Sequence, residues 1–219
     1  MSREGHSLRL VVLGASRGTG GAVVSEAMRR GYQVTAVSRT IPPTAQDGAI
    51  WIAGDARDPA ILERAFAVAD AVVTAVVTAV GVKSPFSTTT LFSETAAAVV
   101  AAMRRAGVQR LIAVTGFGAG DSRGHGGFLF NRLVMPVVAR RVYADKDREE
   151  AIIRGSDLRW TIVRPGALTN GPATGRVAPL LGPDEYRFGR ISRADVARFV
   201  VDRVEANDFV SQTPVVVGG

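Results

Sequence analysis

The chain has 219 residues, 47% of them hydrophobic and 21% charged, which is the size and composition of one ordinary globular domain covering residues 1–219. Because it has no cysteine and only two histidines, His6 and His125, it excludes disulfides and thiolate metal sites and argues against any metal centre. The net charge of +7 does not indicate nucleic-acid binding, because the arginines are scattered and form no basic run interleaved with aromatic residues.

Apolar runs of strand type alternate with helical segments along the chain. Leu8–Leu13 reads as a strand, the glycine-rich turn Gly14–Gly21 follows it, and Ala22–Arg30 reads as a helix stopped by Gly31. The further predicted strands are Val34–Ser38, Ile50–Ala53, Ala71–Val77, Arg110–Thr115, Trp160–Arg164 and Pro214–Val217. They are rich in Val, Ile and Ala without polar alternation, as in a parallel sheet buried on both faces. The sequence therefore predicts an α/β fold: a single doubly wound Rossmann-type parallel sheet of about seven strands with helices on both faces.

The predicted helices have recognisable boundaries. Asp58 and Pro59 supply an N-cap and a first-turn proline for a helix that runs to Ala67. Ser192 and Asp195 form a capping box at the start of the last helix. The two remaining predicted helices cover Thr88–Ala106, with Ser87 as N-cap and Gly107 as the terminator, and about Phe128–Arg154.

Neither the apolar runs nor the N-terminal segment indicates a membrane protein. The longest apolar run, around Ala71–Val82, is shorter than the ~20 residues that span a bilayer. Residues Met1–His6 lack the apolar core of a secretory signal. We therefore expect a cytoplasmic protein that binds no membrane, and the sequence leaves open whether it is a monomer or a homodimer.

Ligands of doubly wound sheets bind beyond the carboxyl ends of the strands. We expect cofactor contacts in the loops that follow the first three strands and substrate contacts in three later loops, at about 78–87, 116–127 and 165–190. The candidate substrate residues in those loops are Phe117, His125 and Tyr186. A lone loop histidine is equally compatible with simple exposure to solvent.

The glycine-rich turn has the spacing G-x-x-x-G-x-G between a buried strand and a helix. This context lets the backbone turn tightly and directs amide N–H groups and a helix N-terminus at a pyrophosphate. The predicted contacts here are Gly14, Ser16, Arg17, Gly18, Thr19 and Gly20. The alternative is a tight turn that serves structure alone.

The residues after the second and third strands predict the kind of dinucleotide. Arg39 follows the second strand without a competing carboxylate, and Arg17 lies in the glycine turn, so a 2′-phosphate and hence NADP(H) is favoured over NAD. After the third strand, the Asp55 side chain can accept from the adenine amino group, and Ala56 lies beside it. The alternatives are that Arg39 is a solvated loop residue and that Asp55 merely helps to start a helix.

Several motifs follow the glycine turn in a familiar order. They are Gly54-Asp55-Ala56, Asp70-Ala71-Val72-Val73, Gly107-Val108, Val114-Thr115 and Trp160-Thr161-Ile162-Val163-Arg164-Pro165-Gly166. Over Leu8–Val217 the chain resembles the atypical short-chain dehydrogenase/reductase proteins with NAD(P)H-binding domains, which include the biliverdin reductase B and flavin reductase group and the NmrA-like proteins. The resemblance implies an NAD(P)-binding Rossmann fold, with cofactor contacts also at Thr115, Lys146, Pro165 and Gly166.

The departures from this family concern its catalytic residues. Main-branch members use a serine after the fifth strand and a Y-x-x-x-K pair, whereas this chain has Thr115 there and Tyr143-Ala144-Asp145-Lys146. Because residues three apart share a helix face, Tyr143 and Lys146 can converge on one cleft. We predict Tyr143 as the proton donor, Lys146 as the cation that contacts the nicotinamide ribose and lowers the pKa of the phenol, and Thr115 as a third catalytic candidate. The alternative is a solvated charged helix surface.

Two further positions bear on the substrate. The serine and the histidine that the flavin reductase group uses would fall at Gly116 and near Ala167, which argues against flavin or biliverdin reduction. We predict an NADPH-dependent oxidoreductase that transfers hydride to a carbonyl or conjugated C=C of a small, fairly apolar molecule. The alternatives are an NADP-binding redox sensor and an enzyme that retains the cofactor for a non-redox rearrangement.

Overall fold

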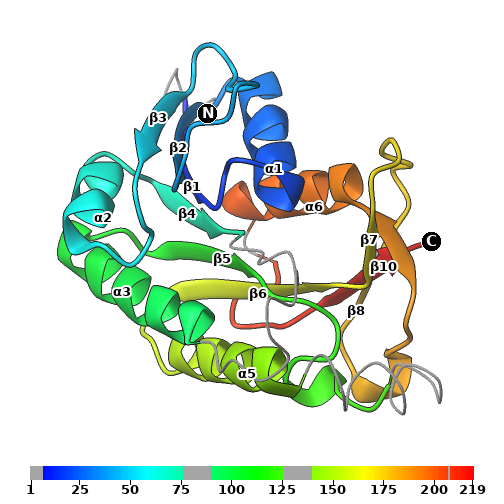
Figure 1. Ribbon diagram of the computed structural model, residues 1–219. Helices are drawn as coiled ribbons and strands as arrows, with labels where there is room; N and C mark the ends of the chain where they lie inside the picture. Colours follow the sequence, from blue (N-terminus) through cyan, green and yellow to red (C-terminus); the bar gives the residue numbers. More distant parts are fainter. Residues whose placement is uncertain (1–6, 76–89, 126–139, 207) are drawn as a thin grey trace, which may run out of the picture.

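The centre of the fold is an eight-stranded sheet (Figure 1). The computed structural model describes residues 7–75, 90–125, 140–206 and 208–219. In space the strands run in the order β3-β2-β1-β4-β5-β6-β10-β8, and neighbours are parallel except for β10 and β8. They are β1 (Arg9–Leu13), β2 (Gln33–Ser38), β3 (Ile50–Ala53), β4 (Ala71–Thr74), β5 (Arg110–Val114), β6 (Arg159–Pro165), β8 (Val177–Leu180) and β10 (Val215–Gly218). The order reverses between β1 and β4, and such a switch point is where doubly wound sheets bind ligands.

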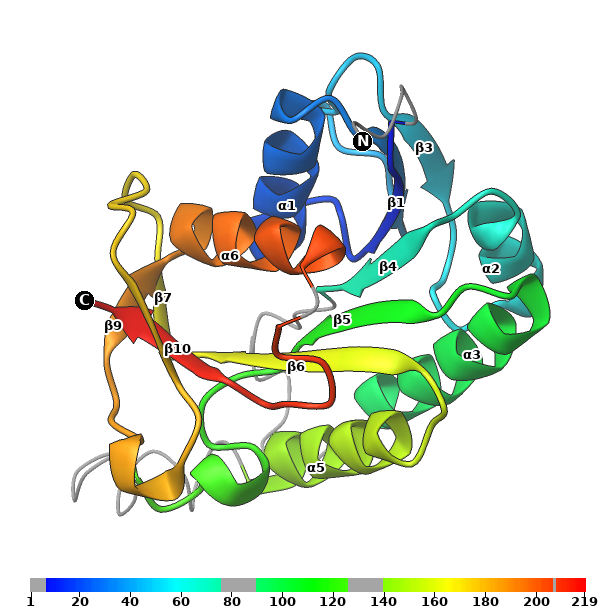
Figure 2. The same ribbon diagram turned by 180° about the vertical axis from the view of Figure 1, so that it is seen from behind.

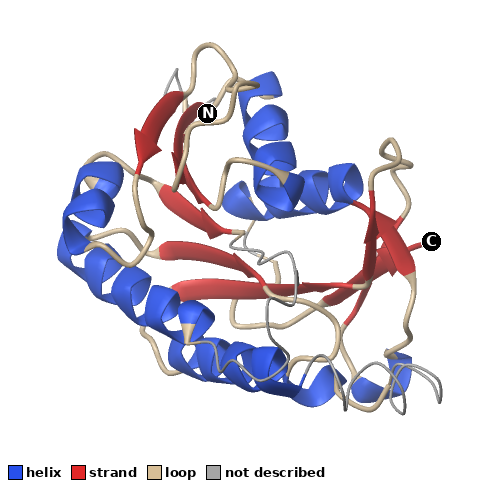
Figure 3. Ribbon diagram, in the orientation of Figure 1, coloured by secondary structure: helices blue, strands red, loops and turns tan. Residues whose placement is uncertain are grey.

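Helices cover both faces of the sheet, as Figures 1 and 2 show from opposite sides. One face is covered by α1 (Gly18–Arg29) and α6 (Arg193–Glu205), which pack on each other, and the other by α2 (Pro59–Phe66), α3 (Leu91–Ala106) and α5 (Arg140–Arg154). The short turns η1 (Gly120–Ser122) and η3 (Pro183–Glu185) and a small parallel sheet of β7 (Ala167–Thr169) and β9 (Arg190–Ser192) complete the described elements (Figure 3). None of the described helices combines the length and apolar character needed to cross a membrane.

The two hydrophobic cores follow from the two-residue period of the strands. In β1, Leu10 and Val12 point into the core shared with α1 and α6, and Val11 and Leu13 into the core shared with α2, α3 and α5. All four side chains are at most 2% exposed. Burying an aliphatic side chain of this size contributes about 1.5–3 kcal/mol, so a strand without polar residues is stable only between two helix layers.

Two local signals were predicted correctly. The Asp58 carboxylate accepts a hydrogen bond of 2.9 Å from Ala60 N and so caps α2. Ser192 caps α6 by accepting from Asp195 N at 2.9 Å. The Asp195 carboxylate in turn accepts from Thr174 N at 3.0 Å and Gly175 N at 2.9 Å. Helix α6 is thereby tied to the loop that follows β7.

Other boundaries differ from the sequence prediction. Helix α1 begins at Gly18 and not at Ala22, because the last glycines of the turn already form its first turn. Strand β4 ends at Thr74, and α3 begins at Leu91 after Thr90. The predicted loop 165–190 contains β7, β8 and η3, and β8 adds the antiparallel edge strand that the expectation of about seven strands omitted. The predicted positions Val77, Ser87 and 128–139 lie outside the described residues.

Candidate functional site

The turn between β1 and α1 has the geometry of a phosphate cradle. Gly14 has a φ of +78°, a left-handed conformation that glycine adopts without strain. A Cβ on Gly20 would lie 2.2 Å from Gly14 O, so the close approach of helix to strand permits no side chain there. Gly14 N and Ala15 N both donate to Val37 O, at 3.0 and 3.1 Å, and this fixes the turn against the end of β2. The N–H groups of the first helical turn have no carbonyl partner within their own helix, so those at the start of α1 can bind a ligand.

A cavity of about 780 Å³ opens in front of this turn, beyond the carboxyl ends of β1–β4. The predicted cofactor residues that line it are Gly14, Ser16, Arg17, Gly18, Thr19, Arg39, Asp55 and Ala56. The lining also includes Leu91 and Thr95 of α3, Asn170 from the loop after β7, and Arg193 of α6. Five other residues predicted to bind the cofactor are not part of this lining among the described residues: Gly20, Thr115, Lys146, Pro165 and Gly166.

The charges around the cavity are mainly positive. The described lining contains one carboxylate, that of Asp55, and four arginines: Arg17, Arg39, Arg57 and Arg193. Arg57 binds both oxygens of Asp55, at 2.7 and 3.0 Å, and lowers the pKa of that carboxyl to about 2. Asp55 therefore stays ionised and neutralises Arg57, and the remaining guanidinium groups favour a ligand that carries phosphates.

Two hydroxyl groups in the cavity wall have no hydrogen-bond partner within the described structure. They are Thr19 Oγ1, at the start of α1, and Thr95 Oγ1, on α3, and both residues are at most 4% exposed. An unsatisfied buried hydroxyl costs about 1–3 kcal/mol. Together with the glycine cradle and the arginines, these hydroxyls fit a polar, phosphate-bearing dinucleotide.

The three predicted catalytic residues meet at the segment that follows β5. From α5, the Tyr143 hydroxyl donates to Phe117 O at 2.8 Å and Lys146 Nζ donates to Thr115 O at 2.7 Å. Thr115 Oγ1 donates to Glu150 Oε1 at 2.9 Å. The i, i+3 spacing therefore brings Tyr143 and Lys146 to one face, as predicted. The prediction that Lys146 lowers the pKa of Tyr143 is wrong: burial raises the pKa of Tyr143, and the cation that partly opposes this is Arg123.

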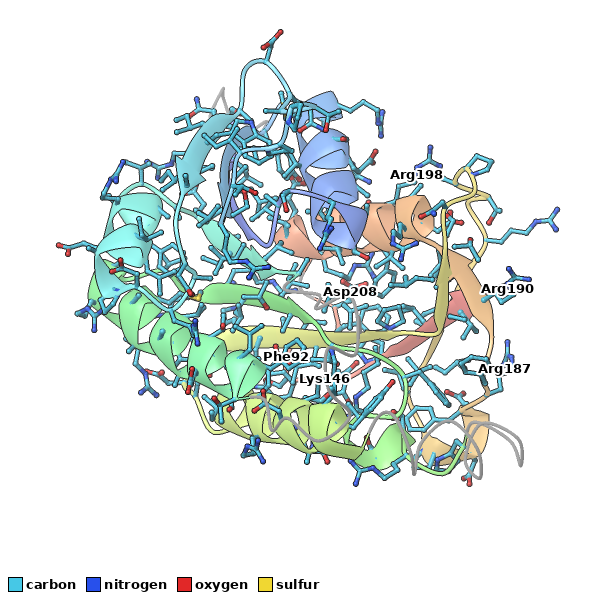
Figure 4. The ribbon with its side chains drawn as sticks, viewed as in Figure 1. Phe92, Lys146, Arg187, Arg190, Arg198 and Asp208 are labelled. Carbon is cyan, nitrogen blue, oxygen red and sulfur yellow. The ribbon has the colours of Figure 1, made fainter. Side chains whose placement is uncertain are left out.

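The alternative of a solvated charged surface is wrong for the middle of α5. Asp145, Lys146, Glu149 and Glu150 are all at most 9% exposed. The Lys146 ammonium lies 4.5 Å from the centre of the Phe92 ring, between α3 and α5 (Figure 4). Burial lowers the pKa of Lys146, although the neighbouring carboxylates counteract it.

Asp145 links the two helices. Its carboxylate accepts from Phe92 N at 2.9 Å and from Ser93 Oγ at 2.5 Å, in the first turn of α3. No side chain of α3 itself caps this helix in the described structure. A negative charge at a helix N-terminus is stabilising, and here Asp145 of α5 adds to that of Glu94 in the first turn of α3.

The buried carboxyl of Glu149 on α5 makes the stability of the fold depend on pH. Its Oε2 has no hydrogen-bond partner in the described structure, and burial raises the pKa of the carboxyl from 4.5 to about 8. A carboxyl with a raised folded-state pKa stabilises the fold at low pH, and this contribution is lost as the pH rises through 4.5 towards 8. Glu149→Gln should therefore match the wild type near pH 5 and gain about 1–3 kcal/mol of unfolding free energy near pH 8.

Urea titrations at the two pH values measure this difference, with the exposed Glu63→Gln on α2 as the matched control. The gain stays below the full desolvation cost, because the uncharged amide of the variant no longer attracts the Lys146 ammonium. A Glu149→Gln variant with the same pH slope as the wild type would contradict the assignment.

The predicted substrate residues come together although they belong to distant segments. The His125 and Tyr186 rings lie 5.5 Å apart at 89°, and Phe117 and Tyr186 share one buried cluster. The Phe188 ring lies 5.6 Å from that of Phe117. The loops at 116–127 and 165–190 thus meet next to Tyr143, which binds Phe117 O. The predicted loop at 78–87 lies outside the described residues.

Pro165 is the last residue of β6 and Gly166 follows it, and the two hold these loops in place. Pro165 O accepts from Phe117 N at 2.9 Å, and Gly166 N donates to Val216 O at 3.0 Å. A Cβ on Gly166 would lie 2.2 Å from Gly189 O. Their contacts in the structure are with neighbouring backbone, and their predicted contact with the cofactor remains a prediction.

Asn170 and Arg193 are two polar cavity residues that the sequence analysis did not single out. Arg193 Nη1 donates to Asn170 Oδ1 at 2.6 Å. Asn170 lies in a loop that was expected to bind ligand, and Arg193 directly follows the recognised cap of α6, so both places were predictable. That the Arg193 side chain reaches the glycine turn depends on the packing of α6 against α1, which no local pattern reveals.

Comparison with known families agrees with this geometry. A family model described as NAD(P)H-binding matches residues 14–207. The chain therefore belongs to the NAD(P)H-binding family, and the predicted resemblance is confirmed. Its cofactor is a nicotinamide dinucleotide.

Known relatives and solved structures share this fold. The chain is 36% identical over 106 residues to "Uncharacterized sugar epimerase YhfK" of Bacillus subtilis, a match covering 48% of this chain and 44% of the relative. It spans about half the length of the curated relatives it matches. ChuY of Escherichia coli, named an anaerobillin reductase, superposes with a TM-score of 0.79 at 24% identity, over 96% of this chain and 97% of that one. A short-chain dehydrogenase/reductase of Veillonella parvula in complex with NADP gives 0.78 at 20% identity, over 97% and 95%.

Proposed function

We propose that this protein is a single-domain NADPH-dependent reductase that transfers hydride to a carbonyl or conjugated C=C of a small, fairly apolar molecule. The observation that carries the proposal is the cavity in front of the glycine cradle, in which Arg17 and Arg39 form no salt bridge among the described residues. Reductase and NADP-bound proteins of the same fold support it as analogies.

Different residues would bind different parts of the cofactor. The glycine turn and the N-terminus of α1 would hold the pyrophosphate, and Arg39, with Arg17, would hold the 2′-phosphate. Asp55 accepts three hydrogen bonds from Arg57, which leaves its carboxylate about one lone pair to accept from the adenine amino group. The bound cofactor supplies the hydride, and the protein positions the acceptor and delivers a proton.

The proton would come from Tyr143, and the apolar cluster of Phe117, His125 and Tyr186 would contact the acceptor. The Tyr143 hydroxyl must exchange its bond to Phe117 O for one to the acceptor oxygen. Lys146 holds Thr115 O and so fixes the segment that precedes Phe117. Oxidation of NADPH across a panel of carbonyl compounds, enones and quinones tests the activity, and binding without any oxidation would contradict it.

Arg39→Ala should weaken NADPH binding by about 10–100-fold and leave NADH binding nearly unchanged, because only NADPH loses a charge-assisted contact of about 1.5–3 kcal/mol. Dissociation constants from fluorescence titration measure the effect, with the exposed Arg64→Ala on α2 as the control. Equal losses for the two cofactors would mean that Arg39 does not bind the 2′-phosphate.

A second candidate function is a dinucleotide-binding redox sensor. It is favoured by one observation: the Tyr143 hydroxyl and the Lys146 ammonium are both satisfied by backbone carbonyls of the protein itself. A sensor binds oxidised and reduced cofactor with different affinities and turns over no acceptor. Equal affinities for NADP⁺ and NADPH would remove this candidate.

A further inference from the structure

We propose that Arg193, the first residue of α6, is a second phosphate-binding group of the dinucleotide site and binds the cofactor pyrophosphate beside the glycine turn. The inference rests on the dinucleotide binding of the proposed function and does not depend on hydride transfer. The backbone of the glycine turn would then share the binding of the pyrophosphate with the Arg193 side chain, which comes from the C-terminal part of the sequence.

The position of Arg193 is fixed from two sides. Its Nη1 donates to Asn170 Oδ1 at 2.6 Å, and its Nε lies 3.7 Å from the point where a Cβ on Gly18 would be. Arg193 and Gly18 both line the cavity. The guanidinium group is therefore at the entrance to the first turn of α1, where the Arg17 side chain makes no capping bond and the first backbone N–H groups have no carbonyl partner within their own helix.

The donors of Arg193 are available to a ligand. A guanidinium has five N–H donors, and the contact with Asn170 is the one hydrogen bond that the described structure gives this side chain. The nearest acidic residue on α6, Asp195, is occupied by Thr174 N, Gly175 N and Ser192 Oγ. The side chain is half-buried, so its charge is only partly screened by water.

The surroundings make a bound anion the missing partner. The first turn of α1 contains no acidic residue, and Arg17 at its N-cap makes no capping bond, although a helix N-terminus favours negative charge. Two guanidinium groups instead stand at this positive end. Independently, the Thr19 hydroxyl in the same turn is 1% exposed and has no partner within the described structure. An anionic group between Arg193 and the turn would accept hydrogen bonds from both the Arg193 guanidinium and the Thr19 hydroxyl.

The location of Arg193 distinguishes its role from that of Arg39. Arg39 follows β2, where the adenosine ribose is expected, whereas Arg193 lies at the α1 N-terminus, where the pyrophosphate is expected. The pyrophosphate is common to NADPH and NADH, and the 2′-phosphate belongs to NADPH alone. Loss of Arg193 should therefore weaken NADPH and NADH equally, whereas loss of Arg39 should weaken NADPH and leave NADH nearly unchanged.

The test is to titrate the protein and its Arg193→Ala variant with NADPH, NADH and adenosine 2′-monophosphate, which has no pyrophosphate. We expect Arg193→Ala to weaken NADPH and NADH by the same factor, about 10–100-fold, and to leave adenosine 2′-monophosphate unchanged. Arg198→Ala, an exposed arginine on the same helix (Figure 4), controls for net charge and should change each affinity by less than about twofold. Thermal unfolding without ligand verifies that the variants fold.

Two results would overturn the assignment. Unchanged affinity for both cofactors in Arg193→Ala would show that this side chain does not contact the ligand. A loss for NADPH alone, or a loss for adenosine 2′-monophosphate, would place Arg193 at the 2′-phosphate instead. Because all readouts are binding constants, a failure of the proposed reductase activity leaves the result for Arg193 interpretable.

Discussion

Tyr143→Phe is expected to lower the turnover of the proposed reduction by about 10²–10⁴-fold and to leave NADPH affinity nearly unchanged. Reduction of a carbonyl produces an alkoxide that requires a proton as the hydride arrives. Burial raises the pKa of Tyr143, so the phenol keeps its proton at neutral pH until a stronger base is present. Phenylalanine retains the ring and removes only the hydroxyl group with its bond to Phe117 O.

Single-turnover measurements with NADPH and an acceptor from the panel give the rate of the chemical step. The matched control is Tyr32→Phe, which removes a hydroxyl bound to Glu205 at the far side of α1 and α6 and should keep full turnover. If Tyr143→Phe keeps full turnover in an assay limited by chemistry, the donor is another group, with Thr115, Tyr186 or water as the successors.

Glu150→Gln is expected to lower the free energy of unfolding by about 3–5 kcal/mol. Arg164 is fully buried, and its guanidinium binds both oxygens of Glu150, at 2.6 and 3.0 Å, and also Asp121. Arginine does not deprotonate in proteins, so the variant must bury a charge that has lost its main partner. Asp121 is too exposed to replace that partner, because half of its side-chain surface is open to solvent.

Urea titration measures the loss, and a double-mutant cycle with Arg164→Met shows its origin. The double variant should recover part of the stability, because it leaves no unpaired buried charge. Glu63→Gln on the exposed face of α2 should stay within about 0.5 kcal/mol of the wild type. A loss below about 1 kcal/mol for Glu150→Gln would show that the pair contributes little to the fold.

Features that depend on neighbouring residues were predictable from the sequence. The bounds of β3 were predicted correctly, because its apolar run ends at Gly54, and the caps at Asp58 and Ser192 act within two or three residues. The glycine turn was recognised for the same reason. The start of α1 was misplaced because glycine is a poor helix former, and here the close contact of Gly20 with Gly14 overrides that propensity.

Features that depend on distant contacts were not predictable. Strands β7 and β9 have three residues each and exist because they pair with one another across the chain. The charges of α5 had the pattern of a solvated surface, yet Glu150 finds its partners on β6 and after β5, and Asp145 on α3. In the site, the glycine-turn contacts were local, whereas Arg193 depended on the packing of α1 against α6.

Asp195 lies in the first turn of α6, and its carboxylate also binds the loop after β7. This contact restricts how that loop can vary in length. At one end of this loop Asn170 is held by Arg193, and at the other Thr174 and Gly175 are held by Asp195, two positions further along the same helix. Both anchors move as one rigid body, so the span between them is set by the helix. An inserted or deleted residue between 170 and 174 would release one anchor. A change in loop length between Asn170 and Thr174 should therefore lower the stability of the fold.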